Sequence, residues 1–591
     1  MRQLTHTPDP LAIDSDGSAH GTRYLVAWKA RPANKQQPFG DPVLVAGHLL
    51  RNNMRTLLFC KTRGICELLY MDLQRYIDSD PELAAYRRKV MNYRGGYTPR
   101  ERREIESALF AGLTSLVVCT NALELGINVG SLDCIVMHGL PYSASSMWQQ
   151  IGRAGRLMQD SLAIVMLTND PVDTYAMKAP SLLFQRLPEH LLIASETSIT
   201  HAHLQCAAFD KPIDPDNSRD QEFIASLGAS SALLKSSLLW DAVMKRYLCK
   251  LRYKPWPAQR VMIRRSGNST DEWKVLLLPS LRLLEDLDPM HALFSLYEGG
   301  IFLHRGHTYS IDKVDPDARV ALVSQTSVSW YTRKRDYREV RPLDTQLSVA
   351  VDPGQSRDQC RNQRPDQSLD RCLDSERSAS TMPLCALYGR VEIITRVFGY
   401  HRVDMQSKKI VETVDHSSPE LRSESLGIWI DVPLSICHRL SQGTHDVEAS
   451  IHAVQHLMIR CIGRLAMGPA AVEDELDTEC KSPLATRTRI PRLVVYEKHP
   501  VLDTSICDVN GTHAGMGGLA ARSLRQISEI MCNALMVVDT CDCKDAPAGC
   551  TGCVELRAGC SENNQCLDKQ GARLLLQLLL SRDPTLAVDA G

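Results

Sequence analysis

The stretch Ser115–Arg156, SLVVCTNALELGINVGSLDCIVMHGLPYSASSMWQQIGRAGR, is where several independent sequence patterns agree. Two short apolar runs rich in β-branched residues, Ser115–Thr120 and Cys134–His138, enclose a polar segment that glycines interrupt. This pattern predicts a strand, a loop, a second strand and then a helix. A strand order of this kind is typical of a parallel α/β sheet, and the rest of the chain is interpreted from that starting point.

The expected helix at the end of this stretch carries residues that suggest chemistry. Gln149, Arg153 and Arg156 fall at i, i+4 and i+7, so we expect their side chains to share one helical face. Gly152 leaves the neighbouring backbone bare enough for a ligand to approach closely. Two arginines at the edge of a parallel sheet suit a triphosphate, whose transferred phosphoryl group gathers negative charge in the transition state. We therefore expect arginine fingers, and the alternative is a helix with two surface arginines.

The sequence motifs of this stretch also resemble those of a known protein family. TNALELGIN and QQIGRAGR resemble motifs V and VI of superfamily-two helicases, and ALELGI with QQIGRAGR is most similar to the Hrq and MrfA type of DNA helicase, which is related to the RecQ group. The resemblance implies ATP with Mg²⁺ as the cofactor, with Gly126, Asn128 and Gly152 at the nucleotide and Gln149 coupling the nucleotide to lobe closure. Asn128 departs from the pattern, because the family usually has Asp there.

Strands and helices alternate upstream of this stretch as well. Thr56–Cys60 has the pattern of a buried strand, Lys61–Ser79 that of an amphipathic helix, and Pro99 suits the first turn of another helix. Alternating strands and helices predict a parallel sheet covered on both faces. We therefore expect one RecA-like lobe of α/β fold, which ends near Asp170.

Residues at the ends of these strands are candidates for gripping nucleic acid. FCKTR resembles motif IV of the family, and YRGGY resembles the motif that follows it. Ligands bind at the carboxyl ends of parallel strands, where family loops hold the sugar-phosphate backbone. The expected DNA contacts are Lys61, Arg63, Arg94, Gly95 and Thr120. For Lys61 and Arg63, a solvated helix start is an open alternative.

Later segments differ in composition and predict further domains. The expected division is 1–45, an interlobe linker with a strand; 46–175, the second RecA-like lobe; 176–265, a helical, winged-helix-like module; 266–344, a small β-barrel; 345–383, a disordered insertion; 384–582, an α+β zinc-binding domain; and 583–591, a tail. In the third segment, basic residues alternate with aromatic ones around Arg252 and Trp256. That mixture suits phosphate contact and base stacking on single-stranded or forked DNA, and an ordinary solvated face is the alternative.

Four cysteines near the C-terminus form a candidate metal site. Cys541, Cys543, Cys550 and Cys553 are spaced as C-x-C and C-x-x-C, and this spacing can bring four thiolates to one tetrahedral Zn²⁺. The same region resembles the zinc-binding domain that ends Hrq and MrfA helicases. We expect structural zinc, with Cys560 or Cys566 as possible replacements for one ligand.

Composition limits the class of protein without deciding it. The chain has 591 residues, which predicts about three to five domains, and its formal net charge is −1. Any DNA-binding surface must therefore be a local patch. Twenty cysteines without a secretory signal indicate reduced thiols in a soluble intracellular protein. The repair role that the resemblance implies suggests the nucleus.

Two motifs that the family uses to bind ATP and Mg²⁺ do not occur in this sequence. It contains neither G-x-x-x-x-G-K-[ST] nor a D-E-x-H box. We expect that the chain alone does not hydrolyse ATP. The open alternatives are a gene model without its front half, a separate polypeptide that carries the first RecA-like lobe, and a non-catalytic, zinc-stabilised protein that binds nucleic acid or regulates a helicase.

Overall fold

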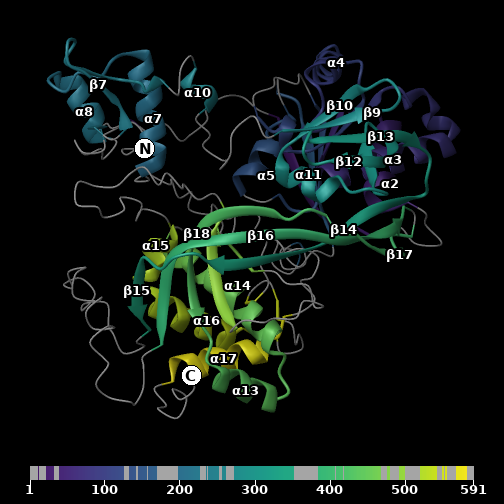
Figure 1. Cartoon of the computed structure of the whole chain (residues 1–591). Coiled ribbons are helices and arrows are strands. Elements are labelled where there is room, and N and C mark those ends of the chain that lie inside the picture. Colours follow the sequence, from purple (N-terminus) through teal and green to yellow (C-terminus); the bar gives the residue numbers. More distant parts are fainter. Residues whose placement is uncertain are drawn as a thin grey trace, which may run out of the picture.

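The chain forms four folded units in sequence order (Figure 1). The computed structural model describes residues 11, 21–31, 39–125, 132–141, 144–155, 158–168, 173, 177, 197–226, 234–235, 237–251, 256–260, 272–351, 384–405, 407–416, 418–466, 476–479, 491–498, 519–541, 543, 549–550, 553–554 and 567–581. Among these residues, no helix is both long and apolar enough to cross a membrane.

The first unit is a six-stranded sheet in which every pair of neighbours runs parallel. The strand order is β1-β6-β5-β2-β4-β3. Their bounds are β1 Arg23–Lys29, β2 Thr56–Cys60, β3 Val90–Tyr93, β4 Leu116–Cys119, β5 Cys134–His138 and β6 Ser161–Leu167. The three central strands are buried almost throughout, as expected for a sheet covered on both faces.

Helices cover both faces of this sheet. On one face, α2 (Asp41–Arg51) and α3 (Arg63–Ser79) bury apolar side chains such as Leu50 and Leu73 against the strands. On the other face, α4 (Pro99–Phe110) and α5 (Ala144–Ile151) contribute Ile105 and Met147 to a second core. Two 3₁₀ turns, η1 (Pro81–Tyr86) and η2 (Asn121–Leu123), complete the unit. The predicted α/β fold of a RecA-like lobe is confirmed.

The second unit is small and lies apart from the sheet in Figure 1. It contains α7 (Thr197–Asp210), α8 (Ser218–Ser226), the hairpin of β7 (Leu239–Asp241) and β8 (Arg246–Leu248), and the short α10 (Pro257–Arg260). Its core gathers Leu204, Ala208, Leu238 and Tyr247 between helix and hairpin. Helices with a β-hairpin agree with the predicted winged-helix-like module.

The third unit, called here the five-stranded module, spans residues 272–326 and lies beside the lobe. Its elements are β9 Trp273–Leu277, β10 Arg282–Leu287, α11 Pro289–Ser295, β11 Ile301–His304, β12 His307–Asp315 and β13 Val320–Thr326. The sequence predicts a small β-barrel here, and its strands pair antiparallel except for β9 and β13, which pair in parallel. A long connection through α11, β11 and β12 separates these two strands, which is what parallel pairing requires.

The fourth unit is a large sheet packed on helices. Its strands are β14 Trp330–Pro342, β15 Leu347–Ala350, β16 Cys385–Asp404, β17 Ile410–Asp415, β18 Leu421–Asp431, β19 Leu476–Thr478 and β20 Arg492–Glu497, and its helices are α13 Leu434–Gln442, α14 Val447–Ala466, α15 Leu519–Leu524, α16 Ile527–Thr540 and α17 Lys569–Leu580. The long strands β14 and β16 reach from this unit toward the lobe (Figure 1). One continuous core joins the sheet to α14, α16 and α17.

Several predicted boundaries shift once the strand pairing is known. β1 pairs with β6, so the lobe begins before the predicted boundary at residue 46. β14 and β15 pair with β16, so residues 330–350 belong with the fourth unit although the prediction placed most of them in the barrel. The expected disordered insertion falls mostly on residues 352–383, which lie outside the described residues, as do 582–591.

Candidate motor site at the strand ends

Three strands of the lobe end side by side and present their carboxyl ends to one hollow. β2 ends at Cys60, β5 ends at His138, and Asn121 follows the end of β4. Ser146 and Gln150 of α5 close the opposite side of the hollow, whose volume is about 40 Å³. That volume holds water molecules and no nucleotide. The described residues therefore do not enclose a nucleotide site here.

Lys61 leaves the end of β2 toward a buried carboxylate. Its Nζ lies 3.5 Å from Oδ1 of Asp173, a residue with no exposed surface. Asp173 also accepts hydrogen bonds from the backbone of Leu140 and from Thr168, which ties the ends of β5 and β6 together. Burial lowers the pKa of His138 beside this pair, so its imidazole is neutral at pH 7. Lys61 is thus fastened within the lobe, although about a fifth of its side chain stays accessible.

Thr120 lies at the end of β4, as its predicted contact with DNA requires. Its backbone N–H donates to Tyr93 O at 3.2 Å, and only 6% of its surface is exposed. The threonine therefore fixes the start of the TNALELGIN loop against β3. The predicted contact with a phosphate is not tested by this geometry.

The helix that should carry the arginine fingers is shorter than predicted. α5 ends at Ile151, and the chain leaves it through Gly155, which has φ +74° and donates its N–H to Leu132 O. Gln149 is exposed, whereas Arg153 lies in the turn after the helix with 8% of its surface exposed. The prediction that Arg153 shares a helical face with Gln149 is wrong, because α5 ends at Ile151 and Arg153 lies in the turn that follows.

Arg153 instead fastens the TNALELGIN loop to the following motif. Its Nε donates to the backbone oxygen of Glu124 at 2.8 Å, and its Nη2 contacts the same oxygen. The Glu124 carboxylate accepts hydrogen bonds from Ser146 Oγ at 2.6 Å and from Gln150 Nε2 at 3.1 Å. The TNALELGIN loop and the QQIGRAGR segment are therefore joined by two sets of hydrogen bonds, one to the backbone of Glu124 and one to its side chain.

Sequence reasoning missed Glu124, Ser146 and Gln150. The spacing of residues in the sequence could have indicated Gln150, because the buried positions recur at the intervals of a helix. These positions are Met147, Gln150, Ile151 and Ala154. Gln150 shares the buried face, and its neighbour Gln149 points outward.

Arg94 has different partners from the predicted DNA phosphate. Its Nε donates to Glu67 at 2.7 Å, its Nη1 to Glu285 at 2.8 Å and its Nη2 to Leu303 O at 3.0 Å. Only 3% of the side chain is exposed. This arrangement corrects the prediction, because the guanidinium is buried and makes four hydrogen bonds to groups of the protein.

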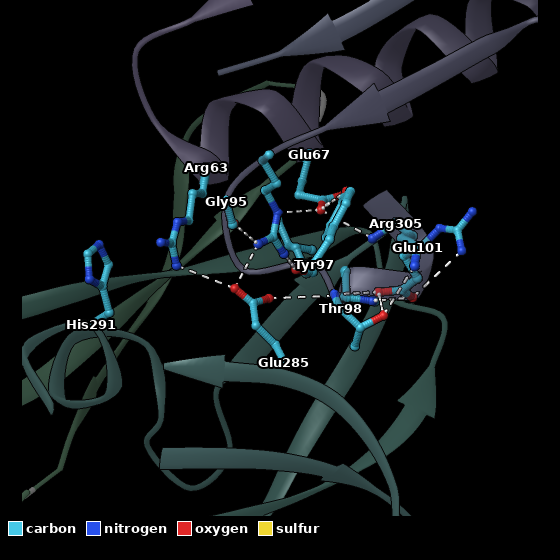
Figure 2. A network of polar contacts seen from close by, with 12 residues as sticks. Arg63, Glu67, Gly95, Tyr97, Thr98, Glu101, Glu285, His291 and Arg305 are labelled. Atoms are coloured by element: carbon cyan, nitrogen blue, oxygen red, sulfur yellow. Dashed lines mark hydrogen bonds and ion pairs between the residues drawn. The ribbon is translucent and has the colours of Figure 1, made fainter. Parts of the chain in front are cut away.

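Arg63 and Gly95 lie at the edge of the same network. Arg63 Nη1 is 3.4 Å from Glu285, and about a third of the arginine side chain is exposed. Figure 2 shows Arg63 beside the Gly95 backbone, with the exposed His291 across from it. Of the predicted DNA contacts at this loop, Arg63 is the basic side chain that solvent still reaches.

Some predicted site residues lie outside the described residues: Gly126, Asn128, Arg156 and Arg252. Trp256 is described and is 61% exposed, with its ring 6.3 Å from that of Phe209. An exposed indole held at the edge of an aromatic pair is suited to stacking on a base. Its neighbours Lys245 and Arg246 sit near the β7–β8 turn, so basic and aromatic groups share this unit.

The four predicted cysteines converge. The Sγ atoms of Cys541, Cys543, Cys550 and Cys553 all lie within 4.8 Å of one another, and four of their separations are 3.4, 3.6, 3.5 and 3.9 Å. A tetrahedral Zn²⁺ with Zn–S bonds of 2.3 Å needs sulfur atoms about 3.8 Å apart, so the cluster fits this ion. Cys560 and Cys566 lie outside the described residues.

A lysine compensates for the charge of the cluster. Lys569 Nζ donates to Cys543 Sγ at 3.1 Å and to Cys541 O at 3.2 Å, and only 5% of the lysine is exposed. Burial opposes the thiolate of Cys543, but the hydrogen bonds from Lys569 and the neighbouring thiols outweigh it and lower its pKa to about 7. With all four positions taken by sulfur, the cluster is suited to a structural ion and not to a catalytic one.

Comparison with known proteins identifies two of the units. Residues 43–158 match the helicase conserved C-terminal domain, and residues 192–266 match the winged helix domain of the ATP-dependent helicase HRQ1. The first match covers the lobe except β1 and β6, and the second match covers the second unit.

Full-length relatives extend the similarity to the whole chain. The ATP-dependent helicases HRQ1 of Saccharomyces cerevisiae and hrq1 of Schizosaccharomyces pombe are each 30% identical over all of this chain, which covers 51% and 52% of their lengths. The chain thus spans about half the length of these relatives. Its fold is similar to that of the DUF1998 helicase MrfA bound to DNA, with a TM-score of 0.65, 22% identity, and coverage of 98% of this chain and 69% of MrfA. The chain is therefore similar over its whole length to about half of each of the two HRQ1 helicases, and it shares the fold of MrfA.

Proposed function

We propose that this chain supplies the second RecA-like lobe and the accessory DNA-binding domains of an ATP-dependent DNA helicase that moves 3′ to 5′ and acts in DNA repair in the nucleus. The observation that carries the proposal is the lock between the TNALELGIN loop and the QQIGRAGR segment, made by Glu124 with Gln150 and Arg153. A loop and a turn joined in this way move together. A change at the nucleotide would therefore reach the loops that hold DNA.

ATP and Mg²⁺ would bind between this lobe and a first RecA-like lobe. The present sequence has no phosphate loop and no acidic box, so another lobe must provide them. That lobe would come from a preceding region, as in relatives of about twice this length, or from a separate polypeptide. In this role Arg156 would reach the γ-phosphate, and Gln149, exposed on α5, would face the cleft. Arg153 would hold the TNALELGIN loop in place from inside the lobe.

Single-stranded or forked DNA is the proposed nucleic-acid partner. Arg63 at the edge of the lobe and Trp256 on the second unit are accessible to solvent. Lys61 and Thr120 lie at the carboxyl ends of strands, where each also makes contacts within the lobe. Contacts of this kind grip the backbone and stack on bases without reading sequence. Structural Zn²⁺, held by the four cysteines, would stabilise the C-terminal unit.

A second candidate is a non-catalytic, zinc-stabilised protein that binds nucleic acid or regulates an intact helicase. The inward orientation of Arg153 favours it, because a fully engaged arginine finger would face a nucleotide. The nucleic-acid-binding form of this candidate agrees with the first candidate on DNA binding and differs from it on ATP hydrolysis.

Titration of a fluorescein-labelled oligothymidylate with the purified chain tests the shared part. We expect saturable binding that weakens as salt rises, together with no ATP hydrolysis by the chain alone. Absence of binding at low salt would contradict the first candidate and the nucleic-acid-binding form of the second. Hydrolysis of ATP by the chain alone, stimulated by the oligonucleotide, would contradict the need for another lobe.

A further inference from the structure

The Arg94–Tyr97 loop of the lobe is held by a residue of another unit. Glu285 lies on β10 of the five-stranded module, 191 residues along the chain from Arg94, and its carboxylate is 2.8 Å from Arg94 Nη1. Both side chains are almost completely buried. The loop follows β3, at the edge of the sheet where the proposed function places the DNA strand.

Glu67 of α3 forms the second half of this contact. From the lobe it accepts hydrogen bonds from Asn92 Nδ2 at 2.8 Å, Arg94 Nε at 2.7 Å and Tyr97 Oη at 2.7 Å. From the module it accepts the backbone N–H groups of the β11–β12 turn, Arg305 at 3.1 Å and Gly306 at 2.9 Å. One buried carboxylate thus joins three side chains of the lobe to the backbone of the module (Figure 2).

Glycines make the approach of the two units possible. A Cβ on Gly96 would lie 1.8 Å from Glu285 Oε1, and Gly96 has φ +100°. A Cβ on Gly306 would lie 2.6 Å from the ring of Tyr70 on α3. The module therefore rests directly on backbone of the lobe, and the Glu285 carboxylate fills the space above Gly96.

Separation of the two units would leave charges without partners. Glu285 also faces His304 Nδ1 at 3.5 Å, and His304 Nε2 faces Glu101 of α4 at 3.3 Å. Separation would break the Arg94–Glu285 pair and the two backbone hydrogen bonds to Glu67 together, and hydrogen bonds to charged groups are among the stronger ones. The units should therefore stay docked while the lobe moves.

We propose that Glu285 is a positioning residue that fixes the Arg94–Tyr97 loop and, with Glu67 and Arg94, makes the five-stranded module move as one body with the RecA-like lobe. Its effect on DNA rests on the proposed function, because that function places DNA at Arg63 and Thr120, which lie beside this loop and its strand. Arg94 in this role acts as the bridge between two carboxylates and makes no contact with a phosphate.

Hydrogen exchange of the full chain without DNA tests the positioning directly. Glu285→Gln removes the charge and keeps the shape, and Asp286→Asn removes the same charge from the exposed neighbour on the same strand. We expect Glu285→Gln to raise exchange roughly tenfold or more in both residues 93–97 and residues 303–306, and Asp286→Asn to leave both segments unchanged. Faster exchange in 303–306 with no change in 93–97 would overturn the proposal.

Binding of labelled oligothymidylate over a range of salt concentrations supplies a readout that a purely structural role would not move. Glu285→Gln and Gly96→Ala should each weaken binding about tenfold with the slope of log Kd against log salt unchanged, since no phosphate contact is lost. A slope reduced by about one would show that Arg94 contacts a phosphate and would overturn its assignment as a bridge. If the unaltered chain fails to bind DNA, the proposed function fails, and the exchange measurement still decides whether Glu285 positions the loop.

Discussion

Gln150 Nε2 donates to the carboxylate of Glu124 at 3.1 Å, across the gap between two motifs that lie 26 residues apart. The adjacent Gln149 is exposed and makes no such link among the contacts described for the lobe. Two neighbouring glutamines on one short helix thus have separate roles, one inside the lobe and one toward the open cleft.

Replacement of Gln150 separates these roles. Gln150→Ala should destabilise the lobe by about 1–3 kcal/mol, because Glu124 loses a hydrogen-bond donor and the buried glutamine side chain loses its packing. Gln149→Ala should change the free energy of unfolding by less than about 0.5 kcal/mol. Urea unfolding with hydrogen exchange in residues 144–155 measures both. A larger cost for Gln149→Ala than for Gln150→Ala would refute the assignment.

Replacement of Gly155 should be destabilising for two reasons, a steric contact and backbone strain, and replacement of a second glycine distinguishes their contributions. Gly155→Ala places a Cβ 2.5 Å from Ser161 Oγ at φ +74°, whereas Gly112→Ala at φ +69° meets nothing within 4 Å. Gly112→Ala should cost about 1 kcal/mol from backbone strain, and Gly155→Ala clearly more. Equal losses of thermal stability in the two variants would show that the steric contact with Ser161 does not contribute to the loss.

The cysteine cluster predicts one zinc ion per chain. Cys553→Ser should abolish zinc by elemental analysis and loosen the C-terminal unit, because the core around α14, α16 and α17 includes Cys553 itself. Cys532→Ser, a change on α16 outside the cluster, should keep the metal. Full zinc content in Cys553→Ser would contradict the ligand set.

A buried histidine predicts how the stability of the same unit varies with pH. Burial, together with His452 and Arg460, holds the pKa of His456 well below 6.5, while its Nδ1–H donates to Val554 O at 3.0 Å. The folded state therefore keeps the ring neutral, and the unfolded chain takes up a proton below pH 6.5. This contribution is fully present above pH 6.5 and falls by up to about 1.4 kcal/mol per pH unit below it.

Urea midpoints of the C-terminal unit between pH 7.5 and 5.5 measure this loss. His456→Gln should flatten the profile, and His438→Gln, at an exposed position on α13, should not. An unchanged profile in His456→Gln would mean that another group controls the pH dependence.

The lobe and the cysteine cluster could be predicted from the sequence because each depends on local patterns. The runs that became β2, β4 and β5 are short, apolar and β-branched, and their helices show clear periodicity between them. The cysteine spacing constrains four sulfur atoms within 13 residues. Local signals of this kind need no knowledge of tertiary contacts.

The partners of Arg94 could not be predicted in the same way. Glu285 is distant in the chain, and a basic residue at the end of a strand has the same local pattern whether it meets a phosphate or a carboxylate. The end of α5 was predictable in part, since Gly152 and Gly155 both disfavour a helix. The i, i+4 spacing of Gln149 and Arg153 led to the opposite expectation, and the structure ends the helix at Ile151.

The most direct test of the central claim is ATP hydrolysis by a fusion of this chain to the half of the Saccharomyces cerevisiae relative that it does not match. We predict hydrolysis that single-stranded DNA stimulates and that Arg156→Ala lowers by about a thousandfold or more, with no hydrolysis by either half alone. Hydrolysis by the fusion that is unchanged in Arg156→Ala would contradict the account of this chain as the second lobe of a motor.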